Sequence, residues 1–107
     1  MSRTLSCISC KGEIDKEEIA KTVDTILKEK GYEPYKSKTS GLTWRGGTFF
    51  ARTFFALSFR KNDIYLQSWM KIPLFGETDL ASVFLEEKKI EPRETFDTIN
   101  NLLTELQ

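Results

Sequence analysis

The chain has 107 residues, the size of one domain. Lys plus Arg and Asp plus Glu both total 16, so the net charge is zero and gives no global attraction to nucleic acid or anionic lipid. Hydrophobic residues make up 39%, which is enough for a folded core. Arg52 interrupts the longest apolar run, which falls short of the roughly 20 residues of a membrane span. Because the N-terminus also lacks the apolar block of a secretory signal, we expect a cytoplasmic protein without a membrane span.

The first residues contain both cysteines, Cys7 and Cys10, within the motif "CISCKG". Two thiolates at this spacing can hold one zinc ion, but a structural site needs four ligands and the chain has no histidine. The remaining ligands would come from a second chain, from carboxylates such as Glu13 or Asp15, or from solvent. Redox chemistry is a weaker alternative, because we expect no strand before the motif and no helix directly after it. The sequence predicts a flexible segment over residues 1–12 and a single domain over residues 13–107. The flexible segment either binds no metal or binds zinc through Cys7 and Cys10.

The segment after the cysteines carries the clearest helix signals. Asp15 can cap the first amides of a helix, and apolar residues then recur at helical spacing. Gly31 supplies a left-handed stop. We predict a helix from Lys16 to Lys30.

The middle of the chain has the pattern of strands. Pro34 confines the segment after the helix to a sheet edge or a strand start, and the glycines of "TSGLTWRGG" indicate a loop. A long strand follows from Phe49 to Arg60, and after the turn "RKND" its antiparallel partner runs from Ile64 to Ile72. This hairpin is predicted to be the centre of the fold.

Aromatic residues occur on both faces of the hairpin. Successive strand residues point to opposite faces, so the odd positions of the first strand and the even positions of the second form one apolar face, on which the first helix should pack. The opposite face carries four aromatic rings among basic side chains, although a solvated face should be mostly polar. With the tryptophan of the preceding loop, this second face is the candidate partner-binding surface: Phe50, Arg52, Phe54, Tyr65, Trp69, Lys71 and Trp44.

The C-terminal part returns to helical spacing. Pro92 fits the first turn of a helix that continues to the end of the chain. Residues 79–89 fit either a short helix, which is slightly favoured, or an irregular connection. The sequence therefore predicts an α+β fold, with an antiparallel β-meander of three or four strands and an N-terminal and a C-terminal helix.

Three explanations fit the aromatic second face. It can be covered, either by the last helix on the side that the first helix leaves free or by the same face of a second copy. It can stack unpaired bases while Arg52, Arg60 and Lys71 hold phosphates. It can also bind another ligand or a partner protein. Cover or self-association is favoured, because bare rings would expose several hundred Å² of apolar area, on the scale of an interaction site.

Two other functions are disfavoured. The order of elements is that of double-stranded RNA-binding domains, but "IEPRETFDTINN" offers one arginine among three carboxylates where that family has a basic cluster. The chain lacks a histidine base and a phosphate-binding glycine loop, and acid pairs such as Glu17 and Glu18 are adjacent and share no helix face. We therefore expect no enzymatic activity.

The stretches "CISCKGEIDKEEIAKTV", "LTWRGG" and "LQSWMKIPLFGE" together resemble small bacterial proteins in which a cysteine-knuckle head precedes an α/β hairpin body. The resemblance implies a bacterial, cytoplasmic origin and no specific function, and the chain lacks the second cysteine pair of a complete zinc ribbon. The predicted function is a non-catalytic interaction or assembly module that self-associates or binds a partner protein through its aromatic sheet face. The alternatives are a single-stranded nucleic-acid-binding domain and a zinc-binding module.

Overall fold

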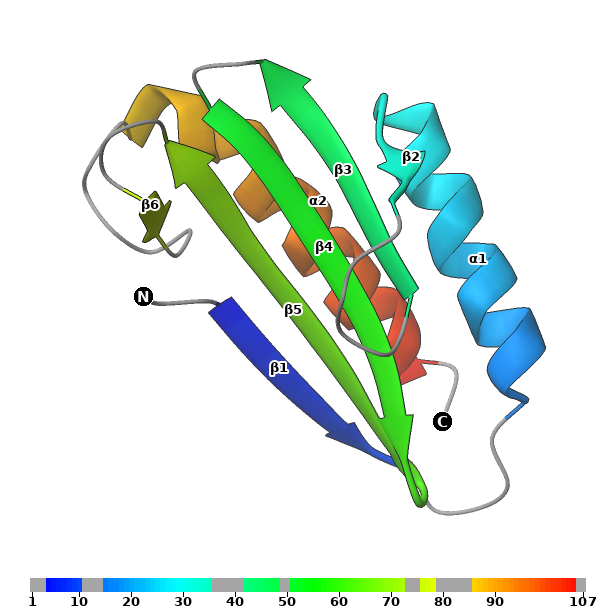
Figure 1. The fold of residues 1–107 in the computed structure, drawn as a ribbon. Helices are drawn as coiled ribbons and strands as arrows, with labels where there is room; N and C mark the ends of the chain where they lie inside the picture. The colour runs from blue at the N-terminus through cyan, green and yellow to red at the C-terminus, as the bar shows by residue number, and fades with distance from the viewer. Residues whose placement is uncertain are drawn as a thin grey trace.

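The computed structural model describes residues 4–10, 15–35, 42–48, 51–72, 76–78 and 86–105. Within these ranges two helices and six strands form an α+β fold (Figure 1). The elements are β1 (Thr4–Ser9), α1 (Lys16–Glu29), β2 (Glu33–Pro34), β3 (Leu42–Thr48), β4 (Ala51–Arg60), β5 (Asp63–Ile72), β6 (Gly76–Thr78) and α2 (Glu86–Glu105).

The β4–β5 hairpin lies at the centre of the sheet, as predicted. The strand order is β1-β5-β4-β3-β2 with every pair antiparallel, and β6 pairs with the end of β5. The two-residue turn at Lys61 and Asn62 brings Leu57 opposite Leu66, so the predicted matching of odd and even positions is confirmed. Phe49 and Phe50 lie outside the described residues.

The predicted number of three or four strands is too low, because two segments read as irregular are strands. Residues 4–9 form β1 on the outer side of β5, although no strand was expected before Cys10. The predicted loop "TSGLTWRGG" contains most of β3, which pairs with β4 from Leu42 to Thr48. Glycine and serine lower local strand propensity, but the ladder offered by a neighbouring strand outweighs that preference.

Gly46 has a specific role in β3. A Cβ atom at this position would lie 2.3 Å from Cδ1 of Tyr32, so glycine allows the tyrosine ring to lie against the strand. The ring also meets Phe55 edge-on, with 5.0 Å between the ring centroids. The Tyr32 hydroxyl donates to Glu91 of α2 at 2.9 Å, and burial together with the Glu91 carboxylate raises the tyrosine pKa. This residue therefore links the end of α1 to both the sheet and α2.

The predicted first helix is confirmed within one residue at its C-terminal end. Asp15 caps it, because its side chain accepts a hydrogen bond from the Glu18 amide at 3.1 Å. Gly31 follows the helix with φ of 92° and provides the expected left-handed stop.

The last helix differs from the prediction. It begins at Glu86, so Pro92 lies inside it rather than in its first turn. Proline in a helix interior removes one hydrogen bond, but Pro92 is buried, and tertiary packing overrides the local penalty. Residues 86–89 are thus helical, whereas 79–85 lie outside the described residues.

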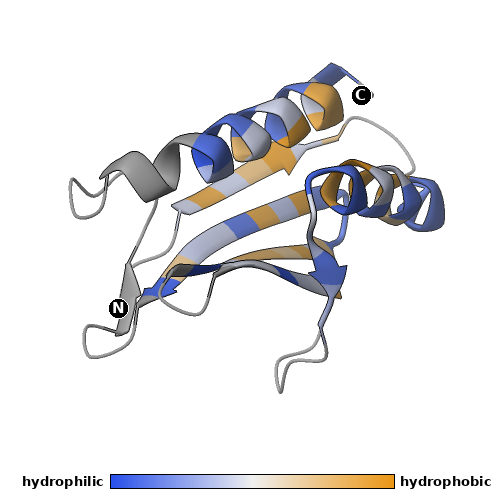
Figure 2. Ribbon diagram, turned by 90° about the horizontal axis from the view of Figure 1, so that it is seen from above, coloured by the Kyte–Doolittle hydropathy of each residue, from blue (hydrophilic) through white to orange (hydrophobic). Residues whose placement is uncertain are grey.

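Both helices lie on the same side of the curved sheet (Figure 2). The main core joins α1, α2 and the face of the hairpin that carries Phe55 and Leu57, and it includes Ile8 of β1. The last helix therefore does not cover the other face of the sheet, which corrects one of the predicted alternatives. Among the described residues, no helix has the length and apolar character needed to cross a membrane.

Candidate functional site

The candidate surface is the face of the sheet opposite the two helices, here called the open face. The register places Arg52 beside Lys71 and Phe54 beside Trp69 on the two central strands. Arg45 of β3 lies opposite Phe54 on the other side of β4. These residues alternate with Phe55 and Leu57 of the core, so they project away from the helices.

Three aromatic rings form a cluster at the centre of the open face. Phe54 and Trp69 stack with 5.4 Å between centroids and 9° between ring planes. Tyr35, directly after β2, meets Phe54 edge-on at 5.7 Å. Phe54 and Trp69 are each only 7% exposed, whereas Tyr35 is 39% exposed. Most of the surface of the two stacked rings is therefore already removed from water within one chain.

Cationic side chains flank the aromatic cluster. The Arg45 guanidinium lies 4.6 Å from the centroid of the Tyr35 ring, in cation–π geometry. Arg52 and Lys71 are exposed cross-strand neighbours of like charge, and the register places Glu77 of β6 on the other side of Lys71. Beside them an open hollow of about 300 Å³ is lined by Gly31, Glu33, Arg45, Gly46, Gly47 and Arg52. The hollow thus combines two arginines with the exposed carboxylate of Glu33, which the register places opposite Arg45.

Tyr65, a predicted surface residue, lies on the open face but away from the aromatic cluster. Its cross-strand neighbour is Cys7 of β1. A hydrogen bond with the Cys7 thiol is the main cause of a raised Tyr65 pKa. The structure thus brings Arg52, Phe54, Trp69 and Lys71 together and places Tyr65 nearer the β1 margin.

The two cysteines do not form a knuckle. Cys7 is exposed on the open face, whereas Cys10 is partly buried against the core on the helix side. Their separation of three residues along an extended chain spans about 10 Å, too far for both thiolates to ligate one zinc ion in this conformation. Within the described ranges, no group of three cysteine, histidine or acidic residues is placed to hold a metal ion.

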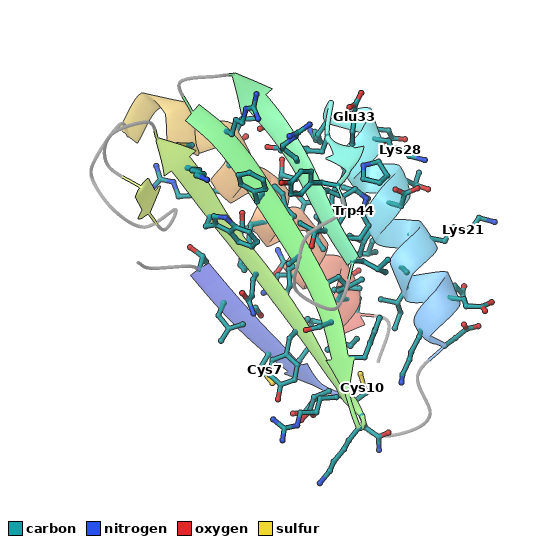
Figure 3. All side chains as sticks on the ribbon, viewed as in Figure 1. Cys7, Cys10, Lys21, Lys28, Glu33 and Trp44 are labelled. Atoms are coloured by element: carbon teal, nitrogen blue, oxygen red, sulfur yellow. The ribbon has the colours of Figure 1, made fainter. Side chains whose placement is uncertain are left out.

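Trp44 lies on the side of the sheet opposite to its predicted position (Figure 3). It belongs to β3, is 3% exposed, and its indole N–H donates to Asp24 of α1 at 2.8 Å. That hydrogen bond, assisted by Lys28 at 3.0 Å, lowers the pKa of Asp24. Trp44 is therefore a core residue that attaches α1 to the sheet, and it contributes nothing to the open face.

Sequence reasoning missed two residues of the surface, Tyr35 and Arg45. Both belong to segments that were read as a short edge and a loop, so strand parity was not applied to them. Once β3 is recognised, the odd position of Arg45 places it on the open face and the even position of Trp44 places it in the core. Phe50, the remaining predicted residue of the surface, lies outside the described residues.

Comparison with known proteins adds no assignment: no family model matches the chain, and neither the curated proteins nor the solved structures contain a significant match.

Proposed function

We propose that this protein is a non-catalytic interaction module of the cytoplasm that binds a partner protein through the open face. The observation that carries the proposal is the exposed ring of Tyr35 with the cations Arg45, Arg52 and Lys71 near it, supported from beneath by the stacked Phe54 and Trp69 and opposite both helices. Tyrosine and arginine are among the residues enriched where protein interfaces concentrate their binding energy.

The burial of the stacked rings favours a protein over single-stranded nucleic acid. Unpaired bases need an accessible aromatic face on which to stack. Phe54 and Trp69 are each 7% exposed, which leaves little of either ring for a base. Tyr35 is more exposed, but Arg45 already lies over its ring.

The charges of the open face favour a partner other than a second copy bound face to face. Such a dimer with its two-fold axis near Arg52 and Lys71 would bring these cations toward the same cations of the other chain, and like charges at an interface oppose association. A partner segment with carboxylates would instead neutralise these cations and relieve their mutual repulsion. We therefore infer an acidic surface or segment as the chemistry of the partner.

The test uses charge reversal on the open face. In cells that express the full-length chain, bound proteins are cross-linked and identified by mass spectrometry, and the affinity of the purified candidate is then measured by calorimetry. The double variant Arg52→Glu/Lys71→Glu should raise Kd at least tenfold, about 1.4 kcal/mol. The matched control is Lys21→Glu/Lys30→Glu, which makes the same charge change at exposed positions in and after α1 and should leave Kd within about twofold.

Equal binding by both double variants would show that the open face is not the interface. A second arm adds a single-stranded oligonucleotide at low salt and records gel mobility. Salt-sensitive binding that is lost in Arg52→Glu/Lys71→Glu would replace the partner protein with nucleic acid.

A further inference from the structure

The two edges of the sheet differ in the features that prevent a further strand from pairing with them. The β2 edge has two residues, one of them charged and the other a proline, and both features discourage pairing with another strand. At the opposite margin, β1 has the sequence "TLSCIS", with six residues and neither a charge nor a proline. Figure 1 shows β1 at the outside of the sheet, and in the described part of the chain it pairs only with β5. Unprotected edges of this kind are templates for strand addition.

The side of β1 that faces away from β5 presents regularly spaced backbone groups. The Cys10 amide donates to the Asn62 carbonyl at 2.9 Å, which marks this pair as a hydrogen-bonded one in the ladder with β5. Hydrogen-bonded and non-hydrogen-bonded pairs alternate in an antiparallel ladder, so Ser6 and Ile8 also direct their N–H and C=O groups toward β5. The N–H and C=O groups of Leu5, Cys7 and Ser9 consequently point away from the sheet.

We infer that two copies of the chain associate by antiparallel pairing of their β1 strands around a two-fold axis at Cys7. This register sets Leu5 opposite Ser9 of the second copy and Cys7 opposite Cys7 of the second copy. It pairs all of residues 4–10 with the same residues of the second copy. Each residue whose backbone N–H and C=O point away from β5 then lies opposite such a residue of the second copy, and the two exchange two hydrogen bonds. A shift of one residue would set outward-pointing groups opposite inward-pointing ones, and these hydrogen bonds would be lost.

The side chains of β1 suit this arrangement. Leu5 is 57% exposed on the open face at the margin of the sheet, where an added strand would shield it. No charged side chain of β1 approaches the axis, so no like charges meet there. The dimer would join two sheets into one, with both open faces on one side and all four helices on the other. It therefore leaves the open face accessible and does not depend on the function proposed above.

The axis at Cys7 also predicts the reactivity of the two cysteines. In a hydrogen-bonded antiparallel pair the Cα atoms are about 5.5 Å apart, within the range that a disulfide spans. Cys7 of the two copies would be such a pair, on the exposed open face. Cys10 would lie opposite Thr4 of the second copy and on the helix side, so two Cys10 thiols would remain far apart.

The first experiment measures the solution mass of the reduced, full-length chain by sedimentation velocity at about 100 µM, where a dimer with micromolar Kd is populated. We expect twice the chain mass of 12.4 kDa. Cys7→Pro removes an N–H that points away from β5, so it should produce a folded monomer, whereas Cys7→Ser should remain a dimer. Cys7→Lys is a second variant, which places two cations at the axis and should also be monomeric even if the proline variant does not fold.

The second experiment compares cross-linking of Cys10→Ser, which retains Cys7, with Cys7→Ser, which retains Cys10. Under mild oxidation with copper phenanthroline, the first should form a covalent dimer at least tenfold faster than the second. A monomeric wild-type chain, a dimer that survives Cys7→Lys, or equal cross-linking of the two variants would overturn the inference. A dimer lost in Trp69→Lys but retained in Cys7→Lys would assign the interface to the open face instead.

Discussion

The two faces of the β4–β5 hairpin carry comparable apolar side chains, but these side chains are buried in different ways. On the helix side, Phe55 and Leu57 are at most 1% exposed, beneath two helices that share one core. On the open face, Phe54 and Trp69 are each 7% exposed within a small cluster of rings, with no described helix above them. The two stacked rings are therefore almost as buried as the core residues, although no described helix lies above them.

The two faces differ most in charge. The helix side is apolar except for polar contacts that link elements, such as Trp44 with Asp24 and Tyr32 with Glu91. The open face instead carries Arg52 and Lys71 as exposed cross-strand neighbours and, beside Arg45, the exposed carboxylate of Glu33. Contacts on the helix side thus serve the fold, whereas the open face carries charges that the fold alone does not require, which supports its proposed role in binding.

The largest expected effect compares Phe55→Ala with Phe54→Ala, one position apart and on opposite faces. Phe55→Ala should lower the free energy of unfolding by about 3–5 kcal/mol, because it leaves a cavity in the shared core. Phe54→Ala should cost about 2 kcal/mol, from lost ring contacts in a smaller cluster. Urea denaturation of both variants measures the difference. Equal losses would mean that the open face is as much a part of the core as the helix side.

An intermediate effect comes from the Trp44–Asp24 hydrogen bond on the helix side. The pKa of Asp24 lies below its ordinary value of 3.8 in the folded state, because the indole N–H and Lys28 stabilise the carboxylate. The carboxylate therefore stabilises the fold above about pH 4, and that contribution is lost as the pH falls through the folded-state pKa. Asp24→Asn should cost about 1 kcal/mol at pH 7.

The difference between wild type and Asp24→Asn should shrink as the pH falls through the folded-state pKa of Asp24, since the protonated side chain no longer carries the charge that the substitution removes. Thermal unfolding of the two proteins across this pH range checks the prediction. A difference that stays constant with pH would show that the charge of Asp24 contributes nothing and that only its geometry matters.

The smallest expected effect is on the open face. Arg52→Glu replaces a like-charge pair with an opposite-charge pair beside Lys71, and its other cross-strand neighbour is the uncharged Gly47, so it should raise the free energy of unfolding by about 0.2–1 kcal/mol. The same variant should weaken partner binding, so stability and binding should change in opposite directions. Arg52→Gln is the control, because it removes the repulsion without adding attraction. A loss of stability in Arg52→Glu would show that the cation supports the fold after all.

The sequence by itself determined the parts of the fold that depend on neighbouring residues in the chain. Asp15, the apolar spacing after it and Gly31 define α1, because capping and helical periodicity act within a few turns. The two-residue turn and strict alternation define the β4–β5 hairpin and place Arg52, Phe54, Trp69 and Lys71 on one face.

Only the tertiary structure decided where the remaining strands and the helices lie. The ladder with β4 makes a glycine-containing segment into β3, which sends Trp44 into the core and Arg45 to the open face. The ladder with β5 makes residues 4–9 into β1 and separates the two thiols onto opposite faces. Both helices share one side of the sheet, where their apolar stripes pack with the Phe55 face of the hairpin into one core. The positions of these strands and helices depend on contacts between residues distant in sequence, so no local sequence pattern predicts them.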